Sequence, residues 1–405
     1  MTKLFHKFFT EYIFYILIIL FSAQSANFLE NKIFLIVTFF YSTGVFFYYR
    51  KKIEKPIDII IVLWITINLI AYFMFGNVVE VKIITFLSIT ARMVLPYYYI
   101  KLFGKNFFYN MEKIIFFLAL ISLPLFFIQY LNPNLFYSLS QSLNAYSINE
   151  QQAYGGWYIG FYMFNGWAPD RNSGFMWEPG AFAFMVVIAM LIKLSKNEMK
   201  FDKYIIVYIL AIITTFSTMG YIVLVIILVS MFIKSRNVMI PFIIMPLFLL
   251  FSINRFTDVD FLLPKIEQYS EEMNTVNYSS DISGNILRMN RFGILTFAFK
   301  ESIKWPLGYG IFEDTPALQI YGESVRGPNT YAQILLRWGW LGLILFLYSA
   351  FLFIAGLFHA QIFFVRLLIF IALASSVFSY GMLNNSILLA MLYYPYINKR
   401  IGLWV

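Results

Sequence analysis

The sequence predicts an all-α polytopic membrane protein with about twelve transmembrane helices and two long loops on the outer side. Of its 405 residues, 60% are hydrophobic and only 13% are charged, and the mean hydropathy is +0.73. Charged residues make up about a quarter of an ordinary soluble domain, so that class is excluded. The apolar residues also fall into runs close to the length of about 20 residues that a spanning helix needs.

We expect spans at 11–26, 32–49, 57–75, 83–100, 114–131, 174–192, 204–217, 219–233, 238–253, 329–357, 362–380 and 382–397. The first run lacks a small-residue cleavage site and precedes many others, so it is interpreted as a retained helix and not as a signal peptide. The stretch 204–233 is interpreted as two short helices. The lysines before and after it lie on one side of the membrane only if the chain turns back between Ser217 and Gly220.

The distribution of basic residues predicts the orientation. The short segments on one side hold eighteen lysines and arginines, whereas the short loops on the other side hold only Lys32 and Lys82. Short cytoplasmic segments are rich in Lys and Arg, so both termini are expected to be cytoplasmic. The net charge of +9 is then a cytoplasmic surplus and does not indicate a nucleic-acid partner.

Two long outer loops divide the chain into five parts. Helices one to five occupy 1–131, the first loop 132–173, helices six to nine 174–253, the second loop 254–328, and helices ten to twelve 329–405. Within the second loop, an amphipathic helix is expected near 285–304, because the residue before a proline leaves helical geometry and Trp305 precedes Pro306. No internal repeat is visible, which disfavours a transporter built from repeated halves.

The chain contains no cysteine and only two histidines, His6 and His359. A disulfide framework and a thiolate site are therefore excluded, and a catalytic zinc site is disfavoured. We expect neither a metal nor a cofactor.

Arginine is concentrated on the outer side. Six of the eleven outer basic residues are arginine, against four of eighteen inside, and the six are Arg171, Arg255, Arg288, Arg291, Arg326 and Arg337. A planar guanidinium can bind phosphate through two parallel hydrogen bonds, which lysine cannot. The pattern favours an anionic ligand on the outer face, although ion pairs with outer carboxylates would also account for it.

Several charged residues each allow two interpretations. Glu178 before Pro179 is typical of a helix start, yet at the bilayer edge it is also a candidate general base with Arg171 as its partner. Arg288 and Arg291 are each also explained as charges on the wet face of an interfacial helix, and for Arg288 this is the favoured interpretation. Arg337 either extends outward to water or points into a polar cavity, and the role of Arg92 within the fourth span stays open.

Three stretches resemble the O-antigen polymerase and ligase superfamily of bacterial inner-membrane proteins. They are RNSGFMWEPGAFAFM after the first loop, RFGILTFAFKESIKWPLGYG in the second, and PNTYAQILLRWGWLGLILFL opening the next span. The arginine that the family carries fifteen residues before a proline falls on Arg291, with Pro306, Gly308 and Gly310 completing the pattern. Two positions depart from the family: Pro328 stands where ligases carry a histidine, and the turn at 217–220 lacks the family's arginine.

The resemblance implies a glycosyltransferase in the inner membrane, with periplasmic loops. It would polymerise a surface polysaccharide, O-antigen or capsule, from oligosaccharide repeat units linked to undecaprenyl diphosphate. Besides that lipid-linked substrate and the bilayer, a chain-length regulator protein is an implied partner. A ligase-type transferase and a lipid-linked saccharide flippase or transporter are the alternatives.

The expected site follows from these residue types. Glu178 and Arg291 are the candidate catalytic residues, because a carboxylate assists the attacking hydroxyl and fixed positive charge stabilises the departing diphosphate. The candidate substrate-binding residues are Arg171, Arg337, Arg326, Arg288, Trp157, Tyr158 and Trp167. The three aromatic residues would stack on sugar rings, although an interfacial aromatic belt is the commoner cause of such residues.

Overall fold

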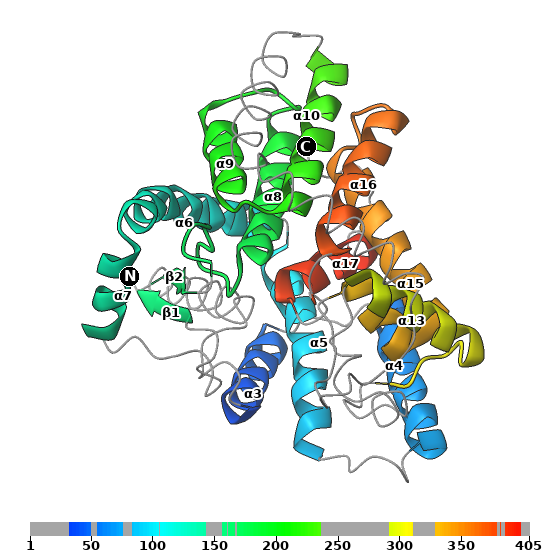
Figure 1. Cartoon of the computed structure of the whole chain (residues 1–405). Coiled ribbons are helices and arrows are strands. Elements are labelled where there is room, and N and C mark those ends of the chain that lie inside the picture. Colours follow the sequence, from blue (N-terminus) through cyan, green and yellow to red (C-terminus); the bar gives the residue numbers. More distant parts are fainter. Residues whose placement is uncertain are drawn as a thin grey trace.

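The computed structural model describes residues 32–49, 55–75, 83–104, 106–142, 156–159, 161–166, 168–235, 291–310, 329–378, 381 and 385–397. This part of the chain is mostly helical (Figure 1). Its helices are α3 (Lys32–Tyr48), α4 (Lys55–Phe75), α5 (Ile83–Phe103), α6 (Asn106–Leu131), α7 (Pro133–Ser142), α8 (Pro179–Lys196), α9 (Lys203–Thr214), α10 (Thr218–Ser235), α13 (Arg291–Lys304), α15 (Thr330–Leu357), α16 (Phe363–Phe378) and α17 (Ser386–Ile397).

Ten of the twelve predicted spans coincide with helices, while 11–26 and 238–253 lie outside the described residues. The predicted pair of short helices is confirmed, since α9 and α10 are separated by a turn at 215–217. Within the described ranges, α6, α8 and α15 are long and apolar enough to cross a membrane on their own. The chain is thus a helical protein suited to a bilayer, and the full count of twelve spans stays a prediction.

The two long loops contain structure of their own. In the second loop, α13 ends at Lys304, directly before the predicted stop at Trp305 and Pro306; residues 285–290 lie outside the described part. The first loop contains α7 and an antiparallel hairpin of β1 (Gly156–Ile159) and β2 (Tyr162–Asn165). The all-α prediction missed this hairpin.

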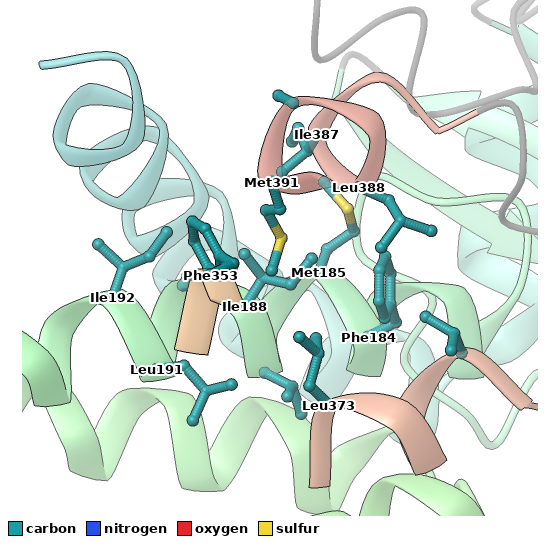
Figure 2. Close-up of a cluster of buried hydrophobic side chains, with 14 of the residues drawn as sticks. Phe184, Met185, Ile188, Leu191, Ile192, Phe353, Leu373, Ile387, Leu388 and Met391 are labelled. Carbon is teal, nitrogen blue, oxygen red and sulfur yellow. The ribbon is translucent and has the colours of Figure 1, made fainter. Parts of the chain in front are cut away.

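Helix α8 lies at the centre of the core. Nearly every side chain from Pro179 to Leu194 is buried, because the helix packs against α6, α9, α10 and α16. Figure 2 shows Met185 and Ile188 of α8 beside Phe353 of α15, Leu373 of α16 and Met391 of α17. A helix that is apolar all round is one buried among other helices, so α8 fixes the position of whatever precedes its first residue.

Candidate functional site

The loop before α8 is held by Asn172, which is fully buried. Its side-chain amide donates to Ser122 Oγ of α6 at 3.1 Å and to Thr214 Oγ1 of α9 at 3.0 Å. Its backbone N–H donates to the carbonyl of Thr214 at 2.9 Å, and its Oδ1 accepts from the N–H of Gly174. A fully satisfied buried network of this kind fixes one conformation, so the loop is rigid relative to α6 and α9.

The hairpin holds the same loop from its other side. Asn165 at the end of β2 donates to Ser173 Oγ and to the carbonyl of Trp177. Gly174 has a φ of +51°, and a Cβ built there would lie 2.4 Å from the ring of Phe182. Only glycine fits both that conformation and that contact, which explains the Asn-Ser-Gly sequence ahead of the helix.

Arg171 lies half-buried at the start of this loop. Its Nε donates to the carbonyl of Thr215 at 3.0 Å, at the carboxyl end of α9. Its own carbonyl accepts from the side-chain amide of Gln129 at 3.2 Å. A cation at the carboxyl end of a helix is favoured by the helix dipole. These contacts orient the guanidinium through Nε and leave the two Nη groups for other interactions.

Glu178 directly precedes α8, so the helix start predicted from the Glu-Pro pair is confirmed, with Pro179 in the first turn. Its side chain makes no capping hydrogen bond, and its Oε1 is buried without a hydrogen-bond partner among the described residues. Burial raises the pKa of this carboxyl above its usual value, while the charges of Arg291 and Arg171 lower it part of the way back. Two cations from separate segments of the chain therefore act on the charge of this carboxyl.

Arg291, one of these two cations, is the first residue of α13. Its carbonyl accepts from the side-chain amide of Asn329 at 2.9 Å. Asn329 is fully buried and caps α15, since its Oδ1 accepts from the N–H of Ala332 at 3.0 Å. One asparagine thus joins the amino-terminal ends of α13 and α15 and fixes the backbone that carries Arg291.

The far end of α13 is fastened to α15 through backbone hydrogen bonds, beside a ring contact between Phe299 and Trp340 at 5.3 Å. Helix α15 is broken at Gly339 (φ 61°, ψ −157°), and the turn after α13 docks into the break. The carbonyls of Leu336 and Arg337 accept from the N–H groups of Tyr309 (2.6 Å) and Gly310 (2.8 Å). A Cβ at Gly308, where φ is +75°, would lie 2.6 Å from the backbone of Arg337. Glycine is required on both sides, and α13 is held at both ends.

Arg337 belongs to this clamp through its own carbonyl, which accepts from the N–H of Gly310. It is about 12 Å further along α15 than Asn329, from a rise of 1.5 Å per residue. Among the described residues, the cations that act on the Glu178 carboxyl are Arg291 and Arg171. The charges of Arg171 and Arg291 act on one carboxyl, and the convergence of the three guanidiniums stays a prediction.

The remaining predicted site residues are only partly placed. Trp157 and Tyr158 pair in the hairpin with Phe164 and Met163 of β2, and the structure describes only their backbone. Trp167, Arg288 and Arg326 lie outside the described residues.

Several helices begin at the same end of the molecule as Glu178. Arg291 and Asn329 place the starts of α13 and α15 together, and the charge contact with Glu178 adds α8. Through its hydrogen bond to Thr215, Arg171 connects the turn before α10 to these helix starts. The amino-terminal end of a helix carries partial positive charge and favours anions. The helix ends add partial positive charge to that of the two guanidiniums, so this end of the molecule suits an anionic ligand.

Histidine and metal ligands are not part of this arrangement. His359 follows the last turn of α15, at the opposite end of that helix from Asn329. Within the described ranges, no group of three or more His, Cys, Asp or Glu side chains could hold a metal ion.

No family model, curated protein or solved structure matches this chain.

Proposed function

We propose that the protein is a polysaccharide polymerase that joins oligosaccharide repeat units carried on undecaprenyl diphosphate, at the periplasmic face of the bacterial inner membrane. The observation that carries the proposal is that the charges of Arg171 and Arg291, from two separate segments, act on the buried carboxyl of Glu178. Two guanidiniums suit a diphosphate. The resemblance to the O-antigen polymerase and ligase superfamily supplies the identity of the lipid and the saccharide.

In the proposed reaction, a hydroxyl oxygen of the incoming unit attacks the anomeric carbon of the growing chain. The bond between that carbon and the phosphate oxygen breaks, and the lipid diphosphate leaves with the bonding electrons. Glu178 accepts the proton of the attacking hydroxyl, for which a raised pKa is favourable because a base works best when its pKa lies near the ambient pH. Arg291 and Arg171 stabilise the charge that develops on the diphosphate.

An apolar groove between α4, α5, α15 and α17 supports a lipid-linked substrate. Its cavity volume is about 120 Å³, and its α15 wall consists of Trp338, Leu341, Gly342, Leu345, Phe346 and Ser349. This wall begins one residue after Arg337, at the break in α15, and runs for about 16 Å along the helix. A hydrocarbon tail in this groove would bring its phosphate end toward the amino-terminal side of α15.

The direct test uses purified protein in lipid nanodiscs, supplied with a lipid-linked repeat unit and no ion gradient. We expect products of two or more units and release of undecaprenyl diphosphate, both lost in Glu178→Gln. Transfer to a lipid A core or a protein acceptor, without longer chains, would identify a ligase. Movement of the lipid-linked unit across a vesicle membrane without bond formation would identify a flippase.

A further inference from the structure

Helix α7 begins where the spanning helix α6 ends. Only Asn132 separates them, and α6 has 26 residues, more than the roughly 20 needed to cross a bilayer. Figure 1 shows α7 leaving the end of α6 at a steep angle and lying beside the β1–β2 hairpin. The first residues of α7 therefore lie at the membrane surface if α6 spans the membrane.

The sequence of α7 is amphipathic. Helical spacing places Asn134 and Ser138 along one face and Leu135, Phe136 and Leu139 along another. Phe136 is buried against the hairpin, with its ring centroid 5.8 Å from that of Tyr162. Leu135 and Leu139 remain 43% and 40% exposed, so only part of the apolar face is covered by the described protein.

This exposed edge continues the apolar surface of α6. Exposed side chains of α6 include Phe117, Ile121, Phe127 and Leu131, the last 80% exposed. No charged residue occurs from Ile114 to Ser142. A helix with one apolar and one polar face beside a spanning segment suits the boundary between headgroups and acyl chains.

We propose that α7 lies in the outer interface of the bilayer, with Leu135 and Leu139 inserted among the acyl chains and its polar face toward water. The partner is thus the lipid surface.

The position of α7 is linked to that of Arg171 by a short series of contacts. Phe136 packs on Tyr162, whose hydroxyl donates to Gln129 Oε1 at 2.8 Å. The amide of Gln129 donates to the carbonyls of Pro169 and Arg171. Helix α7 would therefore fix the depth of Arg171 relative to the lipid phosphates, whatever reaction the site performs.

The absence of cysteine allows a direct test on the full-length protein in nanodiscs. Single variants Leu135→Cys and Leu139→Cys, with Asn134→Cys and Ser138→Cys as matched controls on the same helix, are labelled with an environment-sensitive fluorophore. Quenching is measured with lipids brominated on the acyl chains and with iodide in water. We expect bromolipid quenching at least two-fold stronger at 135 and 139 than at 134 and 138, with the opposite order for iodide.

Two outcomes would overturn the proposal. Equal iodide quenching at all four positions would place α7 in water. Protection of positions 135 and 139 from both quenchers would mean that protein covers the apolar edge, either another part of this chain or a second copy.

Discussion

The two ends of α8 both gather charged residues, but they do so in opposite ways. At the carboxyl end, Lys196 pairs with Glu112 at 3.7 Å and Lys193 with Asp202 at 3.3 Å. At the amino end, Glu178 has an Oε1 without a hydrogen-bond partner in the described part of the chain, near two arginines. Both ends carry carboxylates and cations. They differ in how many of these groups have hydrogen-bond or ion-pair partners.

The carboxyl end is a completed network. Glu112, which is 5% exposed, also accepts from the hydroxyl of Tyr208 at 2.8 Å. Asp202 caps α9 by accepting from two backbone N–H groups at 3.0 Å. The ammonium of Lys196 lies 3.7 Å from the ring centre of Tyr109, a cation–π contact. Buried charges with such partners stabilise the packing of α6, α8 and α9 and leave little for a substrate.

The amino end is incomplete in a way that a substrate could complete. A buried carboxylate oxygen without a partner is costly, and strongly perturbed carboxyl groups gather at functional sites. The comparison teaches that charge alone does not mark a site in this protein. The predictions below change one end at a time, beginning with the largest expected effect.

Replacing Arg291 by alanine should reduce polymer formation by about 10²- to 10³-fold, the usual cost of removing one group that stabilises developing charge. Arg291→Lys should not restore activity, because an ammonium lacks the planar fork of donors. The measurement is polysaccharide ladder length in cells at equal membrane abundance, followed by turnover of purified protein. Full-length ladders in Arg291→Ala would remove this residue from the site.

The backbone clamp between α13 and α15 should matter almost as much. Gly308→Ala introduces a methyl group against the backbone of Arg337 and displaces α13, and a misplacement of about 1 Å can cost about 10²-fold in rate. Gly104→Ala is the matched control, because Gly104 has a similar φ of +58° but open space around a Cβ. Activity is measured per folded molecule. Equal losses in both variants would show that backbone conformation, and not the clamp, is responsible.

Breaking the network at the carboxyl end should act on stability and not on the reaction. Glu112→Ala removes the partner of Lys196 and of Tyr208, and loss of one member of a buried ion pair costs about 3 kcal/mol or more. Thermal unfolding in detergent should show a lower midpoint, with unchanged turnover in the molecules that stay folded. A normal midpoint combined with lost turnover would mean that this end takes part in the reaction.

The smallest expected effect is a gain in stability at the amino end. The native state binds the Glu178 proton more tightly than the unfolded chain does, so this carboxyl lowers stability as pH rises from its ordinary pKa of 4.5 through the raised native value. Glu178→Gln removes the ionisable group. Its unfolding midpoint should exceed that of the natural protein above this pH range, and the difference should disappear below pH 4.5. An unchanged or lower midpoint at neutral pH would argue against a buried, incompletely paired carboxylate.

Several features could be predicted from the sequence because they depend on local chemistry. Trp305 and Pro306 end α13 where proline geometry requires it, and the turn at Ser217 follows from the basic residues on either side. Asn329 carries the ordinary signal of a helix cap, an asparagine before the first helical residue, although its bond to Arg291 joins residues far apart in sequence. Long-range contacts of this kind cannot be derived from local patterns.

Other features depend on tertiary contacts and were therefore missed or misinterpreted. Gly339 lies in an apolar run that predicts a continuous helix. The break there follows from the carbonyl of Pro306, which packs against Gly339 and accepts from the N–H of Trp340. The hairpin is anchored by contacts of Tyr162 and Asn165 to distant residues. The Glu-Pro pair predicts the start of α8 correctly, but it gives no sign that the charge of Arg291, far away in sequence, acts on the Glu178 carboxyl.

The most direct test of the central claim compares a Glu→Gln substitution at the amino end of α8 with one beside its carboxyl end. Glu178→Gln and Glu112→Gln are purified into nanodiscs, and polymer formation from a lipid-linked repeat unit is measured per folded molecule. We predict a loss of about 10²-fold or more in Glu178→Gln and near-normal turnover in Glu112→Gln. Near-normal turnover in Glu178→Gln, or equal losses in both, would contradict the assignment of the reaction to the amino end of α8.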